Sequence, residues 1–133
     1  GKYEELIKNK ISMALFREDS LDEIAKVAEK MDEKALVHIK VDTGMGRIGV
    51  RPDEDGVIFA GKILANPSLC LEGVFTHFAK ADESNKDFTY RQIERFQEFT
   101  GKIKETYHYQ IPIIHASNSA GIIDIKEANT DKP

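Results

Sequence analysis

Apolar and polar positions along this chain follow two spacings, one typical of buried strands and the other of helices. Short apolar runs predict four strands, at residues 11–16, 35–42, 71–78 and 111–115. Helical spacing of apolar residues fills the stretches before and between them, at residues 3–10, 19 onward, 52–66 and 82–104. Because helices and strands alternate regularly, the pattern predicts a parallel sheet with right-handed crossovers.

Capping residues indicate where two of these helices begin. Asp19 or Ser20 is expected to cap the helix that follows the first strand. Pro52 and Asp53 are expected to open the helix after the second strand, which should end near Asn66. The second strand is apolar on both faces except at two positions, which is typical of a parallel strand covered on both sides.

Two architectures fit this order of elements: a doubly wound sheet, or part of a (β/α)8 barrel. A complete barrel needs about 250 residues. The chain has 133 residues, so four helix–strand units amount to about half of one. Periodicity alone does not decide between the two architectures.

Composition narrows the class of protein. Apolar residues make up 41% of the chain and charged residues 32%, and no apolar run approaches the length of a membrane span. The net charge is −4 with no basic stripe, which argues against a nucleic-acid partner. Cys70 is alone, which excludes a disulfide framework or a cysteine-based zinc site. The first residues do not read as a signal peptide, and a reducing, cytoplasmic setting fits best.

The segment from Val37 to Val50 is the most informative part of the sequence, since a strand runs directly into a glycine-rich loop. Gly44 to Gly49 formally match the dinucleotide fingerprint G-x-G-x-x-G. That fingerprint requires a helix to begin on the glycines, whereas the residues up to Pro52 are predicted to be extended. A plain turn is the simplest alternative, but Arg47 between the glycines suits an anionic or phenolate oxygen.

Two later strand ends carry further polar residues. His77 lies near the end of an apolar strand, where a satisfied core histidine is the more common role. Asn118 and Ser119 follow the fourth strand, and residues from Ser119 onward are expected to begin another helix. A helix N-terminus at this point suits a phosphate, whereas a simple N-cap by either residue needs no ligand. The residues alone leave both interpretations open.

An acidic stretch follows His77. Asp82 and Glu83 are expected to cap the long helix predicted at residues 82–104. The spacing of the acidic residues up to Asp87 fits no EF-hand, and we predict no metal site.

Taken together, several segments resemble alanine racemase, a pyridoxal-phosphate (PLP) enzyme. The resemblance is carried by Lys40-Val41-Asp42-Thr43-Gly44-Met45-Gly46-Arg47, by Gly73 to Ser84, and by His115-Ala116-Ser117-Asn118-Ser119-Ala120-Gly121. It favours the barrel: an α/β fold whose parallel βα units form about half of a (β/α)8 TIM barrel. Residues 1–133 would then be part of one PLP-binding barrel domain.

The resemblance also implies roles for individual residues. Arg47 should approach the phenolic oxygen of PLP, and His77 should pack against the pyridine ring. Asn118 should lie in the cofactor pocket, and Ser119 should bind the phosphate. Lys40 takes the place of a lysine that is often carbamylated in the family, and the resulting anion would pair with Arg47.

Residues 1–133 show no match to the family's Schiff-base lysine, or to the tyrosine that acts on the opposite face of the substrate from the other subunit of a homodimer. The resemblance implies that the parent protein interconverts L- and D-alanine for bacterial wall synthesis. The isolated chain is expected to be inactive, and to self-associate through unpaired sheet edges. Alternatives are a racemase of the same fold acting on serine, lysine or arginine, and a non-catalytic PLP-binding barrel protein. A purely structural or interaction module is the remaining option.

Overall fold

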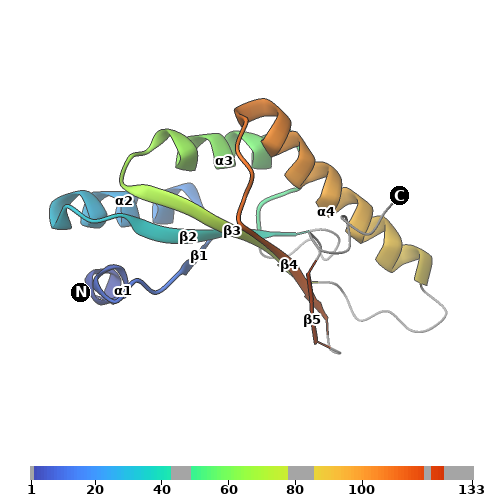
Figure 1. Cartoon of the computed structure of the whole chain (residues 1–133), viewed down its shortest axis with the longest axis horizontal. Helices are drawn as coiled ribbons and strands as arrows, with labels where there is room; N and C mark the ends of the chain where they lie inside the picture. The colour runs from blue at the N-terminus through green and yellow to red at the C-terminus, as the bar shows by residue number, and fades with distance from the viewer. Residues whose placement is uncertain (1, 43–48, 78–85, 119–120, 125–133) are drawn as a thin grey trace.

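The computed structural model describes residues 2–42, 49–77, 86–118 and 121–124 (Figure 1). Within these ranges helices and strands alternate as far as the fourth strand, as the sequence predicted. The elements are α1 (Lys2–Lys8), β1 (Met13–Leu15), α2 (Glu18–Met31), β2 (Ala35–Val41), α3 (Glu54–Ala65), β3 (Leu69–His77), α4 (Lys86–Tyr107), β4 (Ile113–Asn118) and β5 (Gly121–Asp124).

The strands form one sheet in the order β1-β2-β3-β4-β5. Strands β1 to β4 are parallel, and each pairs with the next along the chain. Neighbouring strands joined through helices in sequential order are the arrangement of a (β/α)8 barrel wall. The predicted fold class is therefore confirmed.

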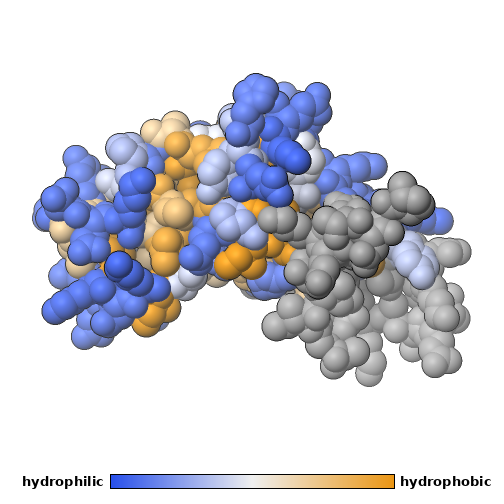
Figure 2. Space-filling view, viewed as in Figure 1, coloured by the Kyte–Doolittle hydropathy of each residue, from blue (hydrophilic) through white to orange (hydrophobic). Residues whose placement is uncertain are grey.

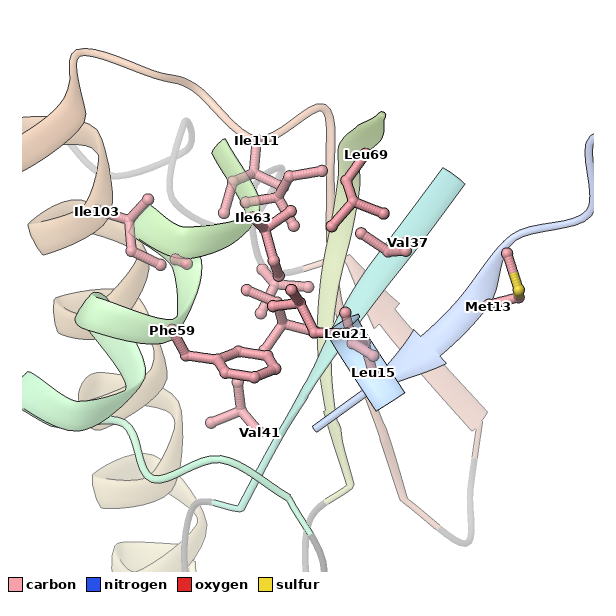
Figure 3. Close-up of a cluster of buried hydrophobic side chains, with 14 of the residues drawn as sticks. Met13, Leu15, Leu21, Val37, Val41, Phe59, Ile63, Leu69, Ile103 and Ile111 are labelled. Carbon is pink, nitrogen blue, oxygen red and sulfur yellow. The ribbon is translucent and has the colours of Figure 1, made fainter. Parts of the chain in front are cut away.

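The hydrophobic core lies between the sheet and the helices that run along one of its faces (Figure 1). Phe59 and Ile63 of α3 and Ile103 of α4 gather with strand residues such as Val37 (Figure 3). Each of these side chains is at most 5% exposed, and burying one stabilises the fold by roughly 1.5–3 kcal/mol.

The opposite face of the sheet is less covered, and we call it the open face. On β2, the side chains of Ala35, Val37, Ile39 and Val41 are buried, whereas those of Leu36, His38 and Lys40 are half-buried and lie on the open face. On β4, Ile113 is 42% exposed. The described residues thus cover only one face of β2, and the prediction of two covered faces is not met within them.

The predicted start and end of α3 are confirmed. The carboxylate of Asp53 accepts a 3.0 Å hydrogen bond from the backbone N–H of Asp55, as an N-cap residue should. The helix ends at Ala65, with Asn66 as its C-cap.

The predicted cap of α2 is wrong. This helix begins at Glu18, and its N-cap is Arg17, which makes no side-chain capping bond. Asp19 and Ser20 lie inside the first turn, so neither occupies the N-cap position. The Asp19 carboxylate accepts a 2.8 Å hydrogen bond from the N–H of Ser20 and pairs with the Arg17 guanidinium at 2.7 Å.

The helix predicted from Ser119 onward is also wrong over the described residues. Gly121 to Asp124 form β5, which pairs antiparallel with β4 from Asn118↔Gly121 to His115↔Asp124. The segment contains the β-branched residues Ile122 and Ile123, which favour a strand. A free edge of β4 gives those residues a backbone partner, and this antiparallel pairing outweighs the local helical signal.

Hydrophilic residues cover the end of the molecule where α1 and α2 lie, and hydrophobic residues show across the middle of the same view (Figure 2). Among the described residues no helix is both long and apolar enough to cross a membrane.

Candidate functional site

The carboxyl ends of β2, β3 and β4 lie side by side at one edge of the sheet (Figure 1). Val41 is in register with Thr76, and His77 with Ser117. Residues that follow these strands therefore leave the sheet at neighbouring points. In parallel α/β folds this edge is where ligand-binding groups gather.

The glycine-rich loop after β2 is closed at its base by backbone hydrogen bonds. The N–H of Val50 donates to the carbonyl of Lys40, and the N–H of Asp42 donates to the carbonyl of Val50, both at 2.8 Å. Gly49 allows this return with a φ of +144°, and a Cβ at this position would lie 2.8 Å from the Asp42 nitrogen. A φ of this sign and size is essentially restricted to glycine.

This geometry rules out the dinucleotide interpretation. Val50 is extended and bridges to Val41, and α3 begins only at Glu54. No helix N-terminus therefore rests on the last glycine of the pattern, as the dinucleotide fold requires. Residues 43–48, including Arg47, lie outside the described residues.

Lys40 projects from the open face of β2, one residue before the end of the strand. Its Nζ lies 5.8 Å from the centre of the Phe16 ring, a cation–π distance. In the sheet register Lys40 pairs with Phe75, and Phe75 pairs with His115. The Phe75 and His115 rings stack with centroids 5.7 Å apart and an interplanar angle of 10°. We call Lys40, Phe75 and His115 the strand-end row.

A second polar group lies one level below this row, towards the amino ends of the strands, and sequence reasoning missed it. The His38 Nε2 and a Glu72 carboxylate oxygen are 2.8 Å apart, and the Ser12 hydroxyl donates to the same oxygen. The hydrogen bond from Ser12, followed by that from His38, holds the pKa of the Glu72 carboxyl below its ordinary value, against the opposing effect of burial. We call Ser12, Glu72 and His38 the interstrand network.

One signal for this network was present in the sequence. His38 and Lys40 are the two polar interruptions of an apolar strand, and residues two apart on a strand share a face. Glu72 starts the next predicted strand. What the sequence does not show is the register between the two strands.

The predicted site residues are only partly described. His77 is the last residue of β3 and Asn118 the last of β4, so their backbones lie on adjacent strands at the same edge. Ser119, like Arg47, lies outside the described residues, as do Asp82 and Glu83. Because β5 follows β4, the described chain gives no helix N-terminus for a phosphate at this point.

Comparison with known proteins adds the family context. Residues 1–132 match the family described as "Alanine racemase, N-terminal domain". The alanine racemase of Halothermothrix orenii is 42% identical over 131 residues, which are 98% of this chain and 34% of that protein.

Solved structures agree with this match. The alanine racemase of Clostridium difficile 630 superposes with a TM-score of 0.80 and 41% identity, over 89% of this chain and 31% of its own. A histidine racemase from Leuconostoc mesenteroides superposes with a TM-score of 0.73 and 27% identity, over 86% and 30%. The chain thus spans about a third of the length of the relatives that it matches.

Proposed function

This chain belongs to the family of alanine racemase N-terminal domains, and we propose that the protein containing it is a PLP-dependent alanine racemase. The observation that carries the proposal is the match over residues 1–132, together with a superposition on an alanine racemase at 41% identity. We further propose that the protein acts as a cytoplasmic homodimer and supplies D-alanine for wall synthesis.

The carboxyl edge of the sheet fits the cofactor in its chemistry. A cation at Arg47 suits the phenolate oxygen, and the small polar residues Asn118 and Ser119 suit the phosphate. An imidazole at His77 suits contact with the pyridine ring. The closed base of the glycine loop supports this assignment, because it brings the residues on either side of the loop back to the end of β2 beside β3.

PLP, when bound, supplies an electron sink that stabilises the negative charge at the α-carbon of an amino acid. The residues of this chain hold and orient the cofactor. We propose that Arg47 and His77 fix its ring and that Ser119 anchors its phosphate. If Lys40 is carbamylated, its negative charge would pair with Arg47 and keep the guanidinium in place.

The groups that move the α-proton are expected elsewhere in the whole protein. A lysine and a tyrosine, acting on opposite faces of the substrate, are the bases that the family implies, and nothing in residues 1–133 matches either segment. We therefore expect the 133-residue chain alone to lack racemase activity.

Racemisation of another amino acid is the second candidate function. The superposition on a histidine racemase shows that this fold also serves that substrate in another protein. Alanine is favoured because the alanine racemase relatives are more similar to this chain, at 42% against 27% identity.

A substrate panel tests the proposal. The full-length protein is purified with PLP and incubated separately with L-alanine, L-serine, L-lysine, L-arginine and L-histidine, and the enantiomers are separated by chiral chromatography. We expect alanine to be racemised fastest, to an equal mixture. Faster turnover of another amino acid would reassign the substrate. Bound cofactor without turnover of any of them would indicate a non-catalytic PLP-binding protein.

A further inference from the structure

Strand β3 carries one extra residue opposite β2. Val37 is in register with Leu71, but the next residue, His38, is in register with Gly73. Glu72 therefore has no partner on β2, which is the arrangement of a β-bulge. A bulge re-aims a side chain, and here the Glu72 carboxylate meets His38 on the open face.

Gly73 makes room for this contact. A Cβ at Gly73 would lie 2.6 Å from both Cε1 and Nδ1 of His38. The imidazole ring thus rests directly on the backbone of β3, in space that a Cβ at residue 73 would occupy. The bulge and the glycine together set the position of the ring.

The hydrogen bonds around Glu72 fix the tautomer of His38. An ionised carboxylate only accepts hydrogen bonds, so the proton of a neutral His38 ring lies on Nε2, which faces Glu72. The Ser12 hydroxyl donates to the same carboxylate oxygen. Ser12 precedes β1, and the other two residues lie on β2 and β3, so the network joins three neighbouring strands.

The network leads directly to the strand-end row. The His38 and His115 rings meet edge to face, with centroids 6.4 Å apart and planes at 63°. His115 in turn stacks on Phe75, the register partner of Lys40. A shift of the His38 ring would therefore be passed through packed rings to the row next to the strand ends.

We propose that Ser12, Glu72 and His38 are positioning residues that hold the strand-end row in place beneath the bound cofactor. This inference rests on the proposed function, because it takes the carboxyl edge of the sheet to be the cofactor site. Among the described residues, the charged or titratable groups around His38 on this face are Glu72, His115 and Lys40. Because the Glu72 carboxylate bonds the His38 ring that contacts His115, the charge of Glu72 should influence the pH dependence of the cofactor's absorbance.

The first test keeps the shape of the network and removes its charge. In the full-length protein, Glu72→Gln is expected to weaken PLP binding by about 3- to 10-fold, the usual effect of weakening a coupled hydrogen bond. It should also change the pH dependence of the absorbance of bound PLP, because it replaces the ionisable carboxyl that bonds the His38 ring with a neutral amide. Glu18→Gln is the matched control, because it removes the ion pair of Glu18 with Lys62 on the helical surface.

The second test separates positioning from simple packing. Gly73→Ala should push the His38 ring aside, and should both destabilise the protein and weaken PLP binding. The double variant Gly73→Ala/His38→Ala removes the clashing ring. We expect it to regain stability but not cofactor affinity.

The outcomes distinguish this inference from the proposed function. If the wild-type protein binds PLP and Glu72→Gln binds it equally well with an unchanged pH dependence, the positioning role is wrong and the proposed function stands. Full recovery of affinity in the double variant would also overturn the positioning role. A wild-type protein that binds no PLP would overturn both.

Discussion

The hydroxyl of Thr76 donates a 2.8 Å hydrogen bond to the backbone carbonyl of Val41, joining β3 near its carboxyl end to the end of β2. Thr76 is fully buried, at 0% exposure. Val41 immediately precedes the residue whose N–H closes the base of the glycine loop. This bond therefore ties together two of the strand ends that we assign to the cofactor site.

Replacing Thr76 with valine should destabilise the fold by about 1 kcal/mol or slightly more. Valine keeps nearly the same shape, but it leaves a buried carbonyl short of one donor. Thr100→Val is the control, because the Thr100 hydroxyl bonds the Gln97 carbonyl of its own helix at 3.1 Å, a local contact. Urea unfolding measures the free energy of unfolding of both variants. Equal losses of this free energy would show that the interstrand bond contributes no more stability than the local one.

Gly49→Ala should destabilise the protein by roughly 1–3 kcal/mol and weaken cofactor binding, because alanine resists the backbone conformation that closes the loop. Gly101→Ala offers the opposite expectation. Gly101 lies within α4, and a Cβ there would meet nothing within 4 Å. This substitution should stabilise by about 0.5–1 kcal/mol. Urea unfolding measures the stability of both variants. A Gly49→Ala variant as stable as wild type would contradict the claim that the loop closes through a backbone conformation that needs glycine.

The interstrand network predicts a pH dependence of stability with a definite sign. Hydrogen bonds from Ser12 and His38 lower the pKa of Glu72 in the folded state below its ordinary value of 4.5. The folded protein therefore gains stability from this group above about pH 4.5, and loses it as the pH falls through the lowered pKa.

Glu72→Gln removes this dependence. The wild type should be the more stable protein at neutral pH, and its advantage over Glu72→Gln should shrink as the solution is acidified. Urea unfolding at a series of pH values checks the prediction. A stability difference that stays constant with pH would mean that folding does not lower the pKa of the Glu72 carboxyl.

Much of the fold could be predicted because local and long-range signals agree. The apolar runs of β2 and β3 lie in the predicted places within two residues, and Asp53 caps α3 as expected. Asp19 misled the prediction of α2 because an aspartate in the first turn and one at the N-cap look alike in sequence. The shared edge at which the parallel strands end followed from the order of elements alone.

The remaining features depend on how strands pair. Whether residues 121–124 form a helix or a strand is decided by their pairing with the free edge of β4, which the spacing of apolar residues does not reveal. The contact of His38 with Glu72 depends on a one-residue shift of register between β2 and β3. Sequence periodicity fixes which face a residue occupies but not its partner across the sheet.

The central claim is that residues at the carboxyl edge of this sheet hold PLP. Its most direct test is the dissociation constant of PLP for the full-length protein and for Arg47→Ala, His77→Ala and Ser119→Ala. Arg51→Ala serves as the control, since Arg51 is an exposed arginine just beyond the loop. We predict losses of about 10-fold or more for Arg47→Ala and Ser119→Ala, a smaller loss for His77→Ala, and none for the control. Unchanged binding in all three variants would contradict the account, and would leave this edge with a structural or interaction role.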